Sequence, residues 1–305
     1  MLAHRKVRGN RLKVPTIYID QNILGFITEG SFPLSKIQNV KWVYSNTHFS
    51  EFSNSEKDMK FVNVLDDIKA AFLEVKFDSN FNATDTALLH RNEAAAFRYT
   101  KFKQIVQESD VNSRVFDEMI VALNGGGLNR SAEEVADTTF DFLNHSDFNE
   151  HQVKEITKIK SDYINRLSEL EKRNADIVKT RKNMGIPKSG LTGISGENVL
   201  AKVWKTIEES VDVDIDTFFG FSGKDEPSKV TGIVRCCAVM DVIGFHSERK
   251  CRKVDRISNV LSDSQHIANA SFCSAIISND EALVQRAKAI YEYLNISTKV
   301  IHYVG

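Results

Sequence analysis

The sequence predicts an α/β fold with a large, mostly α-helical insertion, and three observations lead to this. Four short segments near the two ends of the chain are apolar and rich in β-branched or aromatic residues, which is typical of buried parallel strands. The first three are each followed by a polar turn and a plausible helix. The long middle region shows helical patterns and no convincing strand. The four strand segments are 16–20, 41–45, 274–278 and 299–303.

Composition and charge narrow the class of protein. The chain has 305 residues, of which 42% are hydrophobic and 27% charged, and these are values of a globular protein. Its formal net charge of -1 excludes a uniformly basic coat for nucleic acid but leaves room for local patches. Neither a signal peptide nor an apolar run of the roughly 18 residues that a membrane span needs is found, so we expect a cytoplasmic protein without a membrane segment.

The cysteines predict neither a zinc site nor a disulfide framework. No pair has C-x-x-C spacing and two cysteines are adjacent, a spacing that does not suit structural zinc. We therefore interpret all of them as reduced thiols: Cys236, Cys237, Cys251 and Cys273.

The simplest domain organisation is a discontinuous core, residues 1–53 and 232–305, interrupted by a helical insertion, residues 54–231. Inside the insertion, "NGGGLNRSAEE" (124–134) ends one helix at its glycines and starts the next at Ser131, with a capping-box glutamate three residues later. The longest helix candidate spans 149–181 and carries a short heptad seam through Leu167 and Leu170. This seam packs on a neighbouring helix of the same chain or forms a homodimer arm, and the pattern leaves both open.

Acidic residues come after the predicted strands. Asp20 ends the first strand, Glu51 lies six residues beyond the second, and Asp280 lies two beyond the third. Asp263 is expected at the start of the helix that leads into the third strand. The carboxyl ends of parallel strands converge on one crevice, and carboxylates that meet there repel one another unless cations lie among them. Oxygen ligands without cysteine favour Mg²⁺ or Mn²⁺ over zinc, and two such ions can promote phosphodiester cleavage.

In their order and chemistry, these pieces resemble the PIN-domain nuclease superfamily over roughly residues 1–53 and 232–305. The shared features are a strand ending in D-x-N, a second strand followed by a helical acid, an Asp on an Ala-rich helix ("DSQHIANASFC"), and a strand followed by S-N-D ("IISNDEALVQRA"). The family differs in having far fewer residues between the second and third acids than this chain has. The positions that match the family's metal-binding acids are Asp20, Glu51, Asp263 and Asp280, and the polar positions that support them are Asn22, Ser278 and Asn279.

The resemblance implies a doubly wound parallel sheet with helices on both faces. It also implies a metal-dependent endonuclease that binds Mg²⁺ or Mn²⁺, with two ions expected, and hydrolyses RNA, less often DNA. A toxin or antiviral defence effector fits this activity, and the insertion would then bind a partner or gate the site. The alternative is a catalytically silent scaffold that binds nucleic acid or protein. A haloacid-dehalogenase-type phosphatase would need D-x-D, and Asn22 occupies the second position.

Two histidines are further candidates for supporting roles. His48 lies three residues before Glu51 and His266 three residues after Asp263, so that each pair shares a helix face. Such a histidine can bind the scissile phosphate, move a proton or orient a carboxylate. The competing interpretation is a buried histidine that is hydrogen-bonded to the backbone.

Basic residues form two short clusters. "SERKCRKVDR" (247–256) directly precedes the Asp263 helix, and "KTRK" (179–182) lies in the insertion. Lys and Arg beside an acid cluster would hold the phosphate backbone of a nucleic acid, whereas an ordinary solvated helix face is the other interpretation. The candidate nucleic-acid-binding residues are Arg249, Lys250, Arg252, Lys253 and Arg256.

Overall fold

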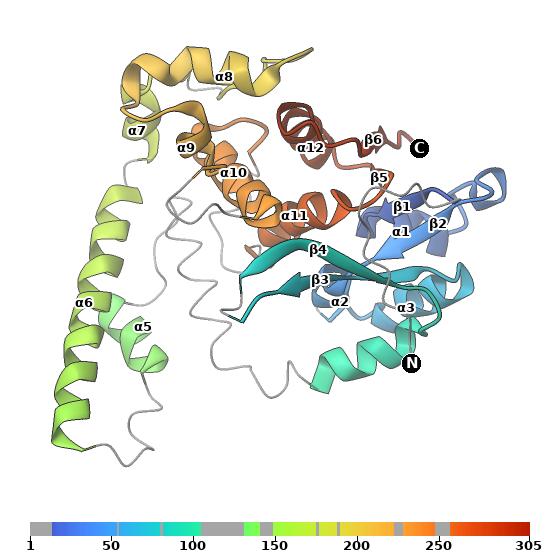
Figure 1. Ribbon diagram of the computed structural model, residues 1–305, viewed down its shortest axis with the longest axis horizontal. Helices are drawn as coiled ribbons and strands as arrows, with labels where there is room; N and C mark the ends of the chain where they lie inside the picture. The colour runs from blue at the N-terminus through green and yellow to red at the C-terminus, as the bar shows by residue number, and fades with distance from the viewer. Residues whose placement is uncertain are drawn as a thin grey trace.

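A computed structural model describes residues 14–53, 55–79, 82–104, 131–140, 149–174, 177–187, 190–222, 228–247 and 257–305. It contains a six-stranded sheet in the order β4-β3-β2-β1-β5-β6, parallel except for β4, with helices on both faces (Figure 1). The strands are β1 Thr16–Ile19, β2 Lys41–Tyr44, β3 Ala71–Phe77, β4 Ala83–His90, β5 Ala275–Ser278 and β6 Lys299–His302. The predicted α/β class is confirmed.

The α-helices alternate with these strands at both ends of the chain and predominate in the described part of the middle. Their bounds are α1 Gln21–Thr28, α2 Asn46–Phe52, α3 Asp58–Asp67, α5 Ala132–Thr139, α6 Glu150–Asn174, α7 Ile177–Asn183, α8 Val199–Ile207, α9 Ile215–Phe219, α10 Lys229–Ile243, α11 Ile257–Ala270 and α12 Glu281–Tyr293. Among the described residues, none of these helices is both long enough and apolar enough to cross a bilayer.

All four predicted strands are present and pair in parallel as β2, β1, β5 and β6. The expectation that no strand interrupts the middle region is wrong, because β3 pairs with β2 and β4 closes that edge antiparallel to β3. The segment "AAFLEVKF" (70–77) is rich in good helix formers, but its tertiary environment outweighs that propensity. The first part of the expected helical insertion therefore extends the central sheet.

Strand side chains alternate between two hydrophobic cores, one on each face of the sheet. Tyr18 and Val43 point into the core formed with α8, α10, α11 and α12. Their neighbours Ile19 and Tyr44 point into the opposite core, which includes side chains of α1, α2 and α3. Because successive residues of a strand face opposite sides, this double burial explains why the strands are apolar almost throughout.

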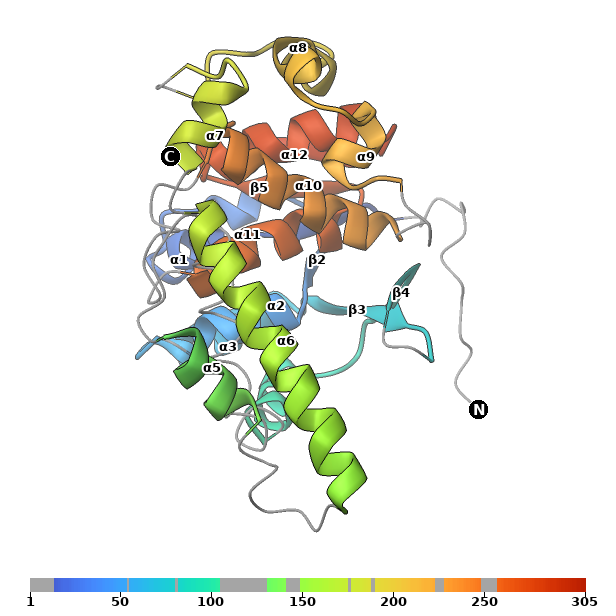
Figure 2. The same cartoon turned by 90° about the vertical axis from the view of Figure 1, so that its left-hand side faces the viewer.

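Helices α5 and α6 lie beside the sheet and pack on each other (Figures 1 and 2). The predicted capping box is confirmed, since the Glu134 amide donates to Ser131 Oγ at 3.1 Å and the Ser131 amide donates to Glu134 Oε2 at 2.7 Å. The side chains of Leu167 and Leu170 lie outside the described residues, so the heptad seam stays a prediction.

One member of the 179–182 basic cluster has a structural role. The Arg181 guanidinium donates to the carbonyl oxygens of Asp241 at 2.6 Å and Val242 at 2.5 Å, the last turn of α10. Next to it, the Leu191 amide donates to the carbonyl of Gly244 at 3.1 Å. A cation at a helix C-terminus interacts favourably with the unpaired carbonyls there. Arg181 thus attaches α7 to α10.

Gly190 lies close to the backbone of Gly244 because it has no side chain, and its replacement by alanine should destabilise the protein. Its φ is +79°, and a Cβ would lie 2.4 Å from the Gly244 carbonyl oxygen. Left-handed strain and overpacking together should lower the free energy of unfolding by about 2–4 kcal/mol. Gly185→Ala is the matched control, because Gly185 has φ +67° but, apart from its chain neighbours, no described residue places an atom within 4 Å of its Cβ position, so only about 1 kcal/mol of strain is expected. Denaturant unfolding of both variants measures the difference, and equal losses would contradict the close contact.

Candidate functional site

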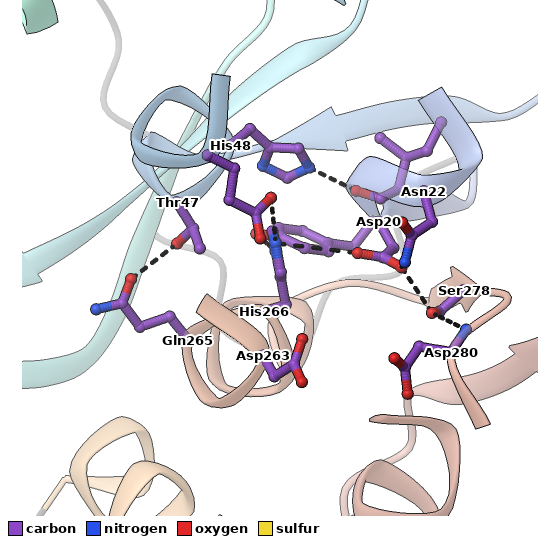
Figure 3. Close-up of polar contacts among 12 residues, drawn as sticks. Asp20, Asn22, Thr47, His48, Asp263, Gln265, His266, Ser278 and Asp280 are labelled. Atoms are coloured by element: carbon purple, nitrogen blue, oxygen red, sulfur yellow. Dashed lines mark hydrogen bonds and ion pairs between the residues drawn. The ribbon is translucent and has the colours of Figure 1, made fainter. Parts of the chain in front are cut away.

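The acids predicted from the sequence come together at the carboxyl end of the sheet. Asp20 directly follows β1, Asp280 lies two residues beyond β5, and Glu51 is on α2, the helix that comes after β2. The strands β2, β1 and β5 are parallel neighbours, so the segments that leave their carboxyl ends emerge at the same edge of the sheet. Figure 3 shows Asp20, Asp263 and Asp280 in this region, with the carboxyl groups of Asp263 and Asp280 facing each other.

Asp20 is the central acid of the group. Only 3% of it is exposed, and its Oδ2 accepts hydrogen bonds from Ser278 Oγ at 2.7 Å and from Asn22 Nδ2 at 3.4 Å. Burial raises the pKa of Asp20 above its ordinary value; the charge of His266 opposes the rise, and the charges of Glu51 and Asp280 add to it. A buried carboxyl beside other acids favours either a proton or a cation at this point.

Asp280 links strand β5 to helix α12. Its Oδ1 accepts the Leu283 amide at 2.9 Å as the N-cap of α12, and its own amide donates to Ser278 Oγ at 2.9 Å. Ser278 therefore bridges Asp20 and Asp280, as the supporting role predicted for it requires. Asn279 makes no side-chain hydrogen bond to any described residue, so its supporting role stays a prediction.

The expectation that Asp263 lies at the start of a helix is wrong. Helix α11 already includes Ile257, so Asp263 lies within it, near its middle. No glycine or proline separates 257 from 263, and the helix continues through both serines beside Asp263. Burial raises the pKa of Asp263 to about 8, with Arg286 opposing and Asp280 and Asp20 adding to the rise.

His266 lies between Glu51 and Asp20. Its Nε2 is 3.1 Å from Glu51 Oε2 and 4.0 Å from Asp20 Oδ1, and its Nδ1 is 2.9 Å from Tyr18 Oη. Burial lowers the pKa of His266, but Tyr18, Glu51 and Asp20 outweigh it and hold the pKa well above its ordinary value. A protonated His266 is thus one internal counter-charge of the acid cluster, as the carboxylate-orienting interpretation requires.

His48 has the structural role. The Ser45 amide donates to its Nδ1 at 3.1 Å, so Nε2 carries the hydrogen and donates to the Ile19 carbonyl at 2.5 Å. Burial lowers the pKa of His48 well below its ordinary value, and the charge of His266 lowers it further. This neutral histidine joins the N-terminus of α2 to the end of β1 (Figure 3), directly before Asp20.

Sequence reasoning missed a polar network behind the acids. Tyr18 Oη is 2.7 Å from Ser45 Oγ, which accepts the Asn269 amide group at 3.1 Å. Asn269 also donates to Thr47 Oγ1 at 3.1 Å, and Thr47 in turn donates to Gln265. These residues are ordinary strand and helix residues in the sequence, so only the tertiary packing reveals the network.

Arg286 was also missed, although a pattern pointed to it. It shares a face of α12 with Leu283 and Ile290, three residues before and four after it, and both are buried. A charged residue on an apolar stripe of a helix indicates a buried ion pair, and Arg286 Nη2 is 3.0 Å from Asp263 Oδ2.

The four acids fit a divalent cation by their chemistry but do not form a closed ligand set. One carboxylate oxygen of each acid accepts a hydrogen bond from a protein group. The second oxygen of each accepts no hydrogen bond from any described residue; these are Asp20 Oδ1, Glu51 Oε1, Asp263 Oδ1 and Asp280 Oδ2. Carboxylate oxygens are the ligands that Mg²⁺ and Mn²⁺ prefer. As the side chains stand, however, no group of three or more described His, Cys, Asp or Glu residues is arranged to hold a metal ion.

The five candidate nucleic-acid-binding residues, Arg249 to Arg256, lie outside the described residues, so their role stays a prediction. A cavity of about 310 Å³ lies beside α8, α12 and β6, and none of the four acids lines it.

Comparisons with protein-family models, curated proteins and solved structures found no match to this chain.

Proposed function

We propose that this chain is a metal-dependent endonuclease with a PIN-like core that hydrolyses phosphodiester bonds in RNA rather than DNA. The observation that supports this most is the meeting of four carboxyl groups, from positions up to 260 residues apart, at the carboxyl end of one parallel sheet. Burial and mutual repulsion raise the pKa of two of them, Asp20 and Asp263. Such a cluster is poorly compensated by the protein alone, and a cation would stabilise it.

In this proposal Asp20, Asp263 and Asp280 would hold Mg²⁺ or Mn²⁺ through the oxygens that accept no hydrogen bond from a described residue. A second ion would need Glu51, whose Oε2 is paired with His266. Bound there, the ion would activate water and stabilise the leaving oxygen of the phosphodiester. Ser278 holds Oδ2 of Asp20 at 2.7 Å and so orients its other oxygen toward the site, whereas the 3.4 Å bond from the exposed Asn22 contributes less. His266 holds Glu51, and its charge reduces the repulsion that the acids exert on a polyanionic substrate.

The second candidate function is a catalytically silent scaffold that binds nucleic acid or protein. The observation in its favour is that two of the acids already have internal partners, Glu51 with His266 and Asp263 with Arg286. The proposal also includes a role as a toxin or antiviral defence effector, and a homodimer or a regulatory protein partner that binds through the insertion.

A cleavage panel tests the proposal. The purified chain is incubated with single-stranded RNA, structured RNA and single- and double-stranded DNA, in Mn²⁺, in Mg²⁺ and in EDTA. We expect cuts within RNA chains in Mn²⁺ or Mg²⁺ and none in EDTA. Cleavage that persists in EDTA would contradict a metal-dependent activity, and binding without cleavage in every metal would favour the scaffold.

A further inference from the structure

Arg286 is a completely buried arginine that bridges two carboxylates. Its Nη2 is 3.0 Å from Asp263 Oδ2 and its Nη1 is 3.4 Å from Asp241 Oδ1, and none of its side chain is exposed. The three residues come from three helices, α12, α11 and α10. Burying charges is costly unless geometry and partners compensate, so this triad needs an explanation beyond ordinary packing.

Asp241 holds the other terminal nitrogen of the arginine, Nη1, at 3.4 Å. It is 5% exposed and lies in the last turn of α10, where its carbonyl accepts a hydrogen bond from Arg181. The guanidinium is a planar fork with fixed donor directions. When Asp241 holds Nη1, the direction of Nη2 is therefore also fixed, and Nη2 points at Asp263.

The contact between Arg286 and Asp263 determines which oxygen of Asp263 is available to bind a cation. Oδ2 is paired with Arg286, and Oδ1 accepts no hydrogen bond from a described residue. In Figure 3 the Asp263 carboxyl group faces that of Asp280. We propose that Arg286, braced by Asp241, is a positioning residue that holds Asp263 in the orientation needed to bind a divalent cation with Asp20 and Asp280. This inference rests on the proposed function.

If Arg286 had a purely structural role, it would only join α12 to α11. A second residue of α12 that bonds to α11 provides a matched control for that role. Tyr291, also on α12, donates from its buried hydroxyl to the Ile267 carbonyl on α11 at 2.5 Å. Tyr291→Phe removes a buried bond between the same two helices without touching an acid. Any effect that comes only from loosening these helices should therefore appear in both variants.

The test is Mn²⁺ affinity, measured by titration calorimetry on the full chain at one pH. The variants are Arg286→Met, Arg286→Lys, Asp241→Asn and Tyr291→Phe, each checked for folding by circular dichroism. Loss of a residue that orients a metal ligand weakens metal binding by about 10–100-fold, and this is the loss expected for Arg286→Met. Arg286→Lys should recover part of the affinity, because an ammonium keeps the charge but not the fork. Tyr291→Phe should bind Mn²⁺ as the wild type does.

The outcomes separate the two proposals. Wild-type affinity in Arg286→Met, or an equal loss in Tyr291→Phe, would overturn the positioning role. If Arg286→Met does not fold, Asp241→Asn decides in its place: weaker Mn²⁺ binding supports the role and unchanged binding overturns it. A wild type that binds no Mn²⁺ would instead contradict the metal-dependent function itself.

Discussion

Replacing Asp20 with asparagine is expected to reduce cleavage by roughly 10³-fold, about 4 kcal/mol of transition-state stabilisation, and at the same time to stabilise the fold. The loss arises because Asn cannot supply a charged oxygen to a cation. The gain arises because burial raises the pKa of Asp20, so ionised Asp20 destabilises the native state. Above the pKa that Asp20 has in the unfolded state, the native state binds the Asp20 proton more readily than the unfolded state does. The free energy of unfolding therefore falls as the pH rises from that value through the higher pKa of the folded state.

The two halves of this prediction are measured separately. Cleavage of labelled RNA in Mn²⁺ gives the activity, and a thermal melt at neutral pH gives the stability. A rise of about 2–4 °C is expected, the equivalent of roughly 1 kcal/mol. Asn22→Ala is the matched control, since Asn22 is exposed and its bond to Asp20 is 3.4 Å long. It should retain most of the activity, whereas an Asp20→Asn protein that cleaves normally would contradict the role of Asp20.

His48→Ala is expected to lower the free energy of unfolding by about 2–4 kcal/mol. The substitution leaves a cavity in the core and removes the partners of the Ser45 amide and the Ile19 carbonyl. His302→Ala is the control, because the partly exposed pair of His302 with Glu281 should contribute less than about 1 kcal/mol. Denaturant unfolding at pH 7.5 measures both, and equal losses would contradict the structural role of His48.

The same histidine predicts a pH dependence. Its folded-state pKa lies well below the ordinary value of 6.5, so the unfolded state binds its proton more readily. The contribution of His48 to stability is therefore complete above about pH 6.5 and declines as pH falls below it. Unfolding measured between pH 5 and 8 should show a smaller decline in His48→Ala than in the wild type. Parallel curves would contradict this assignment.

The sequence predicts the parts of the fold that short local patterns determine. The four parallel strands are short apolar runs bounded by polar turns, and the acids beyond them are fixed by chain connectivity, so their meeting at one edge is a consequence of a parallel sheet. The strand β3 was missed because its Ala, Leu, Glu and Lys residues favour a helix in isolation, and β4 was missed because it begins in "FDSNFNATD" (77–85), which is typical of a break between helices. The placement of Asp263 within α11 was missed because serine and aspartate suit both a helix start and a polar helix face.

The supporting residues depend on packing between segments that are distant in the chain. Tyr18 contacts His266 across 248 positions, and Arg286 contacts Asp241 across 45. No local pattern specifies such pairs. His48 and His266 have the same spacing to an acid, yet one bonds to backbone groups and the other to a carboxylate, because only His266 faces Glu51 and Asp20.

The most direct test of the acid cluster as a cation site is an anomalous difference map from a crystal soaked in Mn²⁺. We predict a peak within about 2–2.5 Å of carboxylate oxygens from Asp20, Asp263 and Asp280. The peak should be absent from Asp20→Asn crystals treated in the same way. A wild-type map without a peak among these acids, at a Mn²⁺ concentration that supports cleavage, would contradict the proposed metal centre.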